Sequence, residues 1–191
     1  MKYDRRKILT LLTGAFVGAS AVLASIPFIA SMKRPKHRSK QIYKDVNITK
    51  LEPGQMLSVT WMGRPIYILK RSKAMLDELE EPNHKLLDPY SHDSIQPEGA
   101  MNVLRSLRPD TFVATGICTH WGCAVAYHPP GENTDLGHDF DEGLFFCPCH
   151  GAKYDLAGRV VKNVPAPKNL AIPNYRFLTD DLIRFEIESS M

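Results

Sequence analysis

Two short segments that combine cysteine with histidine constrain this chain more than any other feature. Residues 118–123 read CTHWGC and residues 147–152 read CPCHGA, and together they hold all four cysteines and two of the seven histidines. Thiolate sulfur and imidazole nitrogen are ligands for transition metals such as zinc and iron. The fold is therefore expected to bring two loops together around a site that offers both kinds of ligand.

The spacing within each segment suggests which residues act together. In an extended segment, residues i and i+2 point the same way, so Cys118 and His120 can reach one ion. Cys149 and His150 are adjacent and diverge, which makes Cys147 the better partner for His150. Cys123 and Cys149 are then free to bridge the loops, although the spacing alone also allows His120 to act with Cys123.

Three kinds of site fit these residues. They are a zinc site with the same ligands, a pair of disulfides without metal, and a 2Fe–2S cluster in which two histidines replace two cysteines on one iron. The third is favoured, because the pattern C-x-H-x-G-C followed by C-P-C-H-G is far more specific than a count of ligands. Every position of that pattern is filled, and the chain resembles the Rieske family.

The resemblance extends over essentially the whole chain. It is closest to the Rieske subunits of proteobacterial ubiquinol–cytochrome c reductase, the cytochrome bc complex. Outside the two ligand segments it is carried by four stretches: Gly54-Gln55, Trp61-x-Gly63-x-Pro65, residues 154–160 (YDLAGRV) and residues 164–170 (VPAPKNL).

The resemblance implies a site and an activity. Cys118 and Cys147 would bind one iron of the cluster, and His120 and His150 would bind the other and act as catalytic groups. Cys123 and Cys149 would form a disulfide between the loops, and the turn Pro165-Ala166-Pro167 would cover the cluster. The cluster would take an electron from ubiquinol, with a histidine ligand taking a proton, and pass the electron to a c-type cytochrome. The implied partners are a cytochrome b subunit, a c-type cytochrome subunit and ubiquinol, in a dimeric complex.

The chain departs from the family pattern at two positions. Trp121 stands where the family usually has leucine, at the exposed tip near the quinone pocket. Ala152 stands where many members have a serine whose hydroxyl donates a hydrogen bond to a cluster sulfur. Tyr154, whose equivalent bonds a ligand sulfur, is retained. The resemblance therefore predicts a midpoint potential below that of relatives with serine, although Tyr154 and Trp121 would also suit simple hydrophobic cover.

The N-terminal part predicts a membrane anchor. Residues 8–32 carry no charge and would span roughly 38 Å as a helix, more than the roughly 30 Å hydrocarbon core. The run is also longer than the apolar region of a cleaved signal peptide. Residues 1–7 contain Arg5-Arg6, which resembles a twin-arginine translocation signal. Residues 33–50 are polar and are expected to form a flexible linker.

Charge and redox chemistry indicate the compartment. Residues 1–40 have a net charge of +8, which leaves −5 for the rest of a chain whose net charge is +3. An acidic domain on a basic, apolar leader argues against nucleic-acid binding. A disulfide requires an oxidising compartment. We therefore expect a single-pass protein of the bacterial inner membrane with residues 51–191 in the periplasm.

The local pattern of residues 51–191 is mainly β. It predicts a hairpin from residues 56–61 and 65–70, a helix over 73–80 capped by Ser72, and strands at 111–116, 144–147 and 182–188, the last as an edge strand. Residues 83–110 are expected to be mostly loop, and residues 127–143 a polar insertion. With the resemblance, the predicted fold class is a Rieske-type antiparallel β domain, with a cluster-binding subdomain at about residues 112–168 inserted into a larger β base.

Other functions fit less well. Rieske ferredoxins and oxygenase components generally lack the counterparts of Cys123 and Cys149 and the anchor. One alternative is the Rieske subunit of an arsenite oxidase, which also has a twin-arginine leader. The other is a zinc-binding module without redox activity. The remaining histidines lie in polar stretches and are expected to be solvated: His37, His84, His92, His128 and His138.

Overall fold

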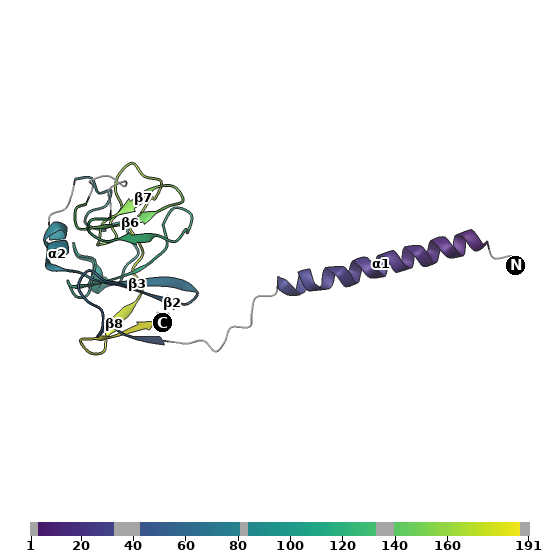
Figure 1. Cartoon of the computed structure of the whole chain (residues 1–191), viewed down its shortest axis with the longest axis horizontal. Coiled ribbons are helices and arrows are strands. Elements are labelled where there is room, and N and C mark those ends of the chain that lie inside the picture. Colours follow the sequence, from purple (N-terminus) through teal and green to yellow (C-terminus); the bar gives the residue numbers. More distant parts are fainter. Residues whose placement is uncertain (1–3, 33–42, 81–83, 133–139, 188–191) are drawn as a thin grey trace. The chain divides into compact units, whose positions relative to one another are not determined.

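A computed structural model describes residues 4–32, 43–80, 84–132 and 140–187. Residues 4–32 and residues 43–187 belong to two compact units. Figure 1 shows a long helix in the first unit and a β-rich domain in the second. The predicted mainly β fold and the apolar N-terminal helix are both confirmed.

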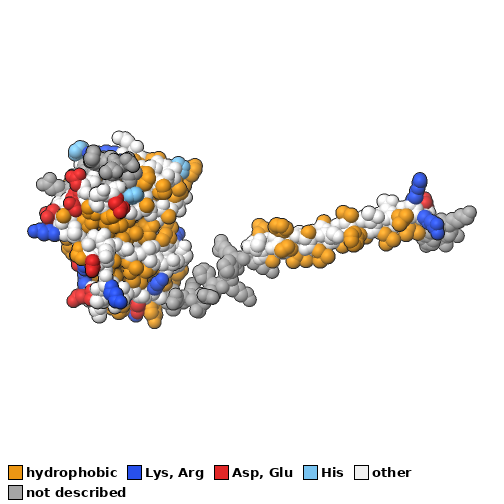
Figure 2. Space-filling view, in the orientation of Figure 1, with side chains coloured by type: hydrophobic (Ala, Val, Ile, Leu, Met, Phe, Trp, Pro, Cys, Tyr) orange, Lys and Arg blue, Asp and Glu red, His pale blue; other side chains and the backbone are white. Residues whose placement is uncertain are grey.

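The first unit is the helix α1 (Arg5–Ser31), which is 27 residues long. Asp4 caps its start by accepting a hydrogen bond from the Arg6 backbone N–H at 3.3 Å. None of its residues is buried, and its apolar side chains cover the surface seen in Figure 2. The hydroxyls of Thr10 and Thr13 donate to carbonyls four residues earlier, so these polar groups are satisfied within the helix. By length and composition α1 could cross a membrane.

Three antiparallel sheets of three strands build the second unit. The first has the order β1-β9-β8, from Tyr43–Asn47, Leu182–Glu186 and Tyr175–Phe177. The second has the order β2-β3-β4, from Met56–Trp61, Arg64–Lys70 and Thr111–Thr115. The third has the order β5-β6-β7, from Ala126–His128, Leu144–Cys147 and Ala152–Tyr154. The third sheet is inserted between β4 and β8, and the predicted boundary near residue 112 falls inside β4.

The predicted helix and hairpin are confirmed. The helix α2 (Lys73–Glu80) begins where the Ser72 hydroxyl accepts a hydrogen bond from the Met75 backbone N–H at 3.2 Å. Strands β2 and β3 are joined at Met62 and Gly63, whose φ angles of 51° and 75° suit a two-residue hairpin turn. In the predicted loop over residues 83–110, the described part contains one short 3-10 helix, η1 (Glu98–Ala100).

Three local predictions are wrong. Residues 43–47 of the predicted linker form β1, which pairs with β9, while residues 33–42 lie outside the described residues. The last strand is not at an edge, because β9 lies between β1 and β8. Tyr127 and His128 do not begin the polar insertion, because they belong to β5; residues 133–139 lie outside the described part.

A tyrosine of the second sheet fixes the two strands that lead to the ligand segments. The Tyr67 hydroxyl donates to the Val125 carbonyl at 2.7 Å, and its ring stacks on Phe145 of β6 with the centroids 6.3 Å apart. The ring also lies against Gly116, where an added Cβ would come within 2.3 Å of Tyr67 Cζ. Only glycine fits at position 116 while the tyrosine ring stays in place.

We predict that Gly116→Ala destabilises the folded domain by about 1–3 kcal/mol, because the buried tyrosine ring has no room to move away. Thermal unfolding of the full chain in detergent measures the loss. The same substitution in a Tyr67→Ala background should cost less, since the obstructing ring is gone. Gly18→Ala is the control, because nothing lies within 4 Å of a Cβ added there. Equal costs of Gly116→Ala in both backgrounds would contradict this explanation.

Candidate metal centre

Strand β4 leads into the first ligand loop, residues 118–123. The loop is closed by a hydrogen bond from the Cys118 N–H to the Cys123 carbonyl at 2.8 Å and by another from the Gly122 N–H to the Cys118 carbonyl at 3.1 Å. Gly122 has a φ of 81°, which the turn requires and glycine adopts without strain. The loop is thus a turn, and the extended geometry assumed for the pairing of Cys118 with His120 is wrong.

Strand β6 delivers the second ligand loop, residues 147–152. The Gly151 N–H donates to the Cys147 carbonyl at 2.9 Å, and Gly151 has a φ of 74°. Cys147 and Ala152 face each other in the register of β6 and β7. Directly opposed residues of antiparallel strands have neighbouring side chains. The position of Ala152 is therefore beside the Cys147 side chain.

The four cysteines divide into one disulfide and two free thiols. Cys123 and Cys149 form a disulfide that joins the two loops, with the Cα atoms 6.6 Å apart. Cys118 and Cys147 are free and buried. The Cys147 sulfur lies within 4.8 Å of both disulfide sulfurs, but a disulfide sulfur carries no thiolate to offer a metal. This arrangement contains one disulfide rather than two and leaves Cys118 and Cys147 as candidate metal ligands.

The two histidines of the motifs meet at the same place. The rings of His120 and His150 stand edge to face with their centroids 4.8 Å apart. His150 is exposed and His120 is half-buried. Among the described residues, His120 Nδ1 is a buried nitrogen without any hydrogen-bond partner. Buried polar atoms normally have a partner, so this orphaned nitrogen fits a site that expects a metal ion.

Hydrogen bonds tie Tyr154 to the first ligand loop. Its hydroxyl lies 3.3 Å from Cys118 Sγ and accepts a hydrogen bond from the Thr119 N–H at 3.2 Å. Burial, and then the contact with Cys118, raise the pKa of Tyr154. Burial is also the main cause that raises the pKa of the Cys147 thiol. Neither group ionises readily in the metal-free chain, whereas a bound metal would deprotonate a thiol.

The proline turn is held against the first ligand loop. The Thr119 hydroxyl donates to the Lys168 carbonyl at 2.6 Å. Ala166 is buried, while Pro165 and Pro167 are exposed on either side of it. Thr119 was not among the predicted site residues. The only signal in the sequence is the position of Thr119 between Cys118 and His120, because the Lys168 carbonyl that it bonds lies 49 residues away.

Trp121 lies at the exposed tip of the site. Its side chain is 77% exposed, and its indole stacks on His120 at 4.9 Å and meets the edge of His150 at 5.2 Å. Of the other histidines, His84 and His92 are exposed and His128 packs on Phe146 of β6. His37 and His138 lie outside the described residues.

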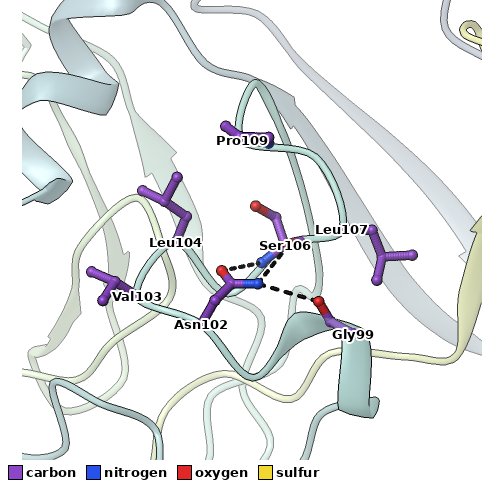
Figure 3. Close-up of a pocket in the computed structure, with 7 residues that line it drawn as sticks. All are labelled: Gly99, Asn102, Val103, Leu104, Ser106, Leu107 and Pro109. Carbon is purple, nitrogen blue, oxygen red and sulfur yellow. Dashed lines mark hydrogen bonds between the residues drawn. The ribbon is translucent and has the colours of Figure 1, made fainter.

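A separate shallow pocket of about 460 Å³ lies along residues 99–109. Figure 3 shows its lining, which contains Asn102, Ser106 and apolar side chains but no histidine, cysteine or carboxylate. The pocket therefore offers none of the ligands found at the paired loops.

Comparison with known proteins agrees with this geometry. The family model "Rieske [2Fe-2S] domain" matches residues 41–176. The chain is 45% identical over 181 residues to the ubiquinol–cytochrome c reductase iron–sulfur subunit of Allochromatium vinosum, covering 94% of this chain and 86% of that protein. It is 34% identical to the subunit of the same name from Bradyrhizobium diazoefficiens, covering 94% and 93%. A chain of a hyperthermophilic respiratory complex III matches 91% of this chain at 21% identity, with a TM-score of 0.43.

Proposed function

This chain belongs to the Rieske iron–sulfur subunits of ubiquinol–cytochrome c reductase, the electron-transfer subunits of that complex, and we propose that four residues of the two loops bind its cluster. Cys118 and Cys147 bind one iron of the 2Fe–2S cluster, and His120 and His150 bind the other. The observation that carries the assignment is that the disulfide Cys123–Cys149 joins two loops whose other cysteines are free, buried thiols and whose histidine rings lie 4.8 Å apart.

A bound Rieske cluster supplies one-electron chemistry at a potential between about −150 and +300 mV. The chain's own contribution is to hold the ligands, to limit water and to provide a proton site. The disulfide joins the two loops, the Thr119 hydroxyl donates to the Lys168 carbonyl next to the proline turn, and the Tyr154 hydroxyl bonds Cys118. These contacts keep the ligand atoms in place with little rearrangement on electron transfer.

The histidines give the site a second property. If His120 binds iron through Nδ1, its buried nitrogen without a partner, Nε2 would remain to hold a proton, which a quinol hydroxyl can supply. His150 is exposed and His120 is half-buried, so the site stands at the surface where a quinol can approach. The exposed apolar indole of Trp121 beside them suits contact with the partner that surrounds the quinol.

The long apolar N-terminal helix supports a membrane location for the subunit. We propose that α1 is the single anchor, that Arg5 and Arg6 belong to a twin-arginine signal, and that the β domain lies in the periplasm, where the disulfide is stable. The proposed partners are the cytochrome b subunit, a c-type cytochrome and ubiquinol, in a dimeric complex of the inner membrane.

Redox titration of intact membranes, followed by EPR of the reduced protein and by haem spectra, tests this function. We expect the EPR signal of a Rieske cluster and co-purification of the subunit with b- and c-type haems. A purified chain that carries zinc, or no iron and sulfide, would refute the cluster. A cluster-containing chain that purifies without haems would place the subunit in another oxidoreductase.

We predict that Ala152→Ser raises the midpoint potential by roughly 40 mV, the equivalent of one added hydrogen bond of about 1 kcal/mol. Ala152 is buried opposite Cys147, so a serine hydroxyl there can donate toward the sulfur atoms of the site. Ala126→Ser on the exposed side of β5 is the control and should leave the potential unchanged. An unchanged midpoint in Ala152→Ser would count against this role of the position.

A further inference from the structure

Three buried arginines and a single buried carboxylate lie around the hairpin that follows Tyr154. Arg71, Arg105 and Arg159 are at most 2% exposed, and Asp155, at 1%, is the only acidic residue buried among those the structure describes. Together these four side chains carry a net charge of +2. Burying charge that is not neutralised costs free energy, so an unbalanced cluster of this kind calls for a reason.

The arginines converge on the hairpin that follows Tyr154. Arg71 donates two hydrogen bonds to the Leu156 carbonyl, at 3.1 and 2.9 Å, and Arg105 Nη1 donates to the carbonyls of Ala157 and Gly158 at 3.0 and 3.1 Å. Arg159 Nε lies 2.6 Å from Asp155 Oδ2. The positive charge is thus fixed directly next to the strand whose tyrosine bonds the Cys118 sulfur.

The backbone at Arg105 is bent to bring this side chain into the interior. Arg105 has a φ of 49°, which is uncommon for a residue other than glycine. Figure 3 shows the turn that imposes it, in which the Asn102 amide bonds the Gly99 and Ser106 carbonyls and accepts from the Ser106 N–H. A strained backbone that persists at one charged residue is often tied to function.

The charges are retained inside an apolar region shared with the ligand-bearing strand. Burial lowers the pKa of Arg71 to about 9 and that of Arg105 to about 10, which leaves both protonated at neutral pH. The Arg71 guanidinium lies 4.7 Å from the centre of the Phe112 ring, and that ring packs on Phe145 of β6. Half-buried Asp88 also attracts Arg105, but it is reached by water. Charges in such surroundings act over longer distances than charges in water.

We propose that the net positive charge of this arginine cluster favours reduction of the site, because positive charge stabilises the added electron. The inference rests on the proposed redox function. The proposal predicts that Asp155 disfavours reduction, because among the described residues its carboxylate is the only buried negative charge. Opposite shifts from removing Arg105 and from removing Asp155 distinguish this electrostatic role from a merely structural one.

The test is a redox titration of the full chain in membranes, read by EPR, for four variants. Arg105→Gln should decrease the ratio of reduced to oxidised sites at a fixed ambient potential by roughly tenfold, which is 59 mV for a one-electron couple. Asp155→Asn should increase that ratio, while its side-chain oxygen still accepts from the Ala157 and Arg159 N–H groups. Arg105→Lys keeps the charge and should stay near the unmodified protein.

Arg108→Gln is the matched control, because it removes the same charge from a partly exposed residue paired with Asp180. It should leave the ratio unchanged. A Rieske signal in the unmodified chain establishes the redox function independently of these variants. Shifts of the same sign in Arg105→Gln and Asp155→Asn, or no shift in Asp155→Asn, would overturn the proposal. If Arg105→Gln fails to assemble a cluster, the sign of the Asp155→Asn shift decides.

Discussion

Replacement of His150 with glutamine is expected to abolish the cluster while the β domain stays folded. Glutamine is of similar size but lacks the imidazole nitrogen that iron requires, so one iron would lose a ligand. Because His150 is exposed, the substitution should change the free energy of unfolding of the cluster-free chain by no more than about 0.5 kcal/mol. EPR of the reduced protein, together with analysis of bound iron and acid-labile sulfide, measures the loss, and far-UV circular dichroism reports the fold.

His92→Gln provides the matched comparison. His92 is also an exposed histidine of a loop, and its ring contacts Tyr90 rather than either ligand loop. This variant should retain the full EPR signal and iron content. A normal cluster spectrum in His150→Gln would remove His150 from the ligand set and with it the proposed site. Loss of the spectrum in both variants would point instead to a general effect of losing a surface histidine.

Much of the site could be predicted from the sequence because its signals are local. The proposed ligand residues lie within two six-residue segments, and glycines occupy the turn positions at Gly122 and Gly151 where φ is positive. The same holds for α2, whose start is fixed by the Ser72 hydroxyl, and for the β2–β3 hairpin, whose turn is set by Met62-Gly63. Each of these features is determined by residues only a few positions apart.

The errors concern contacts between residues that are distant in the sequence. The polar composition of β1 predicts a linker, but β1 pairs with β9, and Arg184 forms an ion pair with Asp45 that spans 139 residues. No local pattern carries that pairing, and it also makes β9 central rather than an edge strand. The buried arginines escaped prediction for a related reason, because charged residues are almost never fully buried unless paired. Arg71 and Arg105 donate to carbonyls of a hairpin 85 and 52 residues away in the sequence.

Removal of the disulfide Cys123–Cys149 is also expected to have a large effect. The double variant Cys123→Ala/Cys149→Ala should lose about 3 kcal/mol of stability, because the bridge closes a loop with a sequence separation of 26 and so restricts the unfolded chain. For a domain of this size the loss corresponds to a decrease in Tm of roughly 6–12 °C. Thermal unfolding of the loaded protein, followed by circular dichroism and by the visible absorbance of the cluster, measures both fold and site.

Loss of the cluster and unfolding of the sheets are expected to occur as two separate thermal transitions. The disulfide joins the two ligand loops, whereas the three sheets share one hydrophobic core, so the cluster absorbance should disappear below the temperature at which the sheets unfold. Treatment of the unmodified protein with a thiol reductant should reproduce the decrease in Tm followed by circular dichroism, and the same treatment should leave the Tm of the double variant unchanged. If the double variant melts like the unmodified protein and keeps its cluster to the same temperature, the disulfide does not restrain the site.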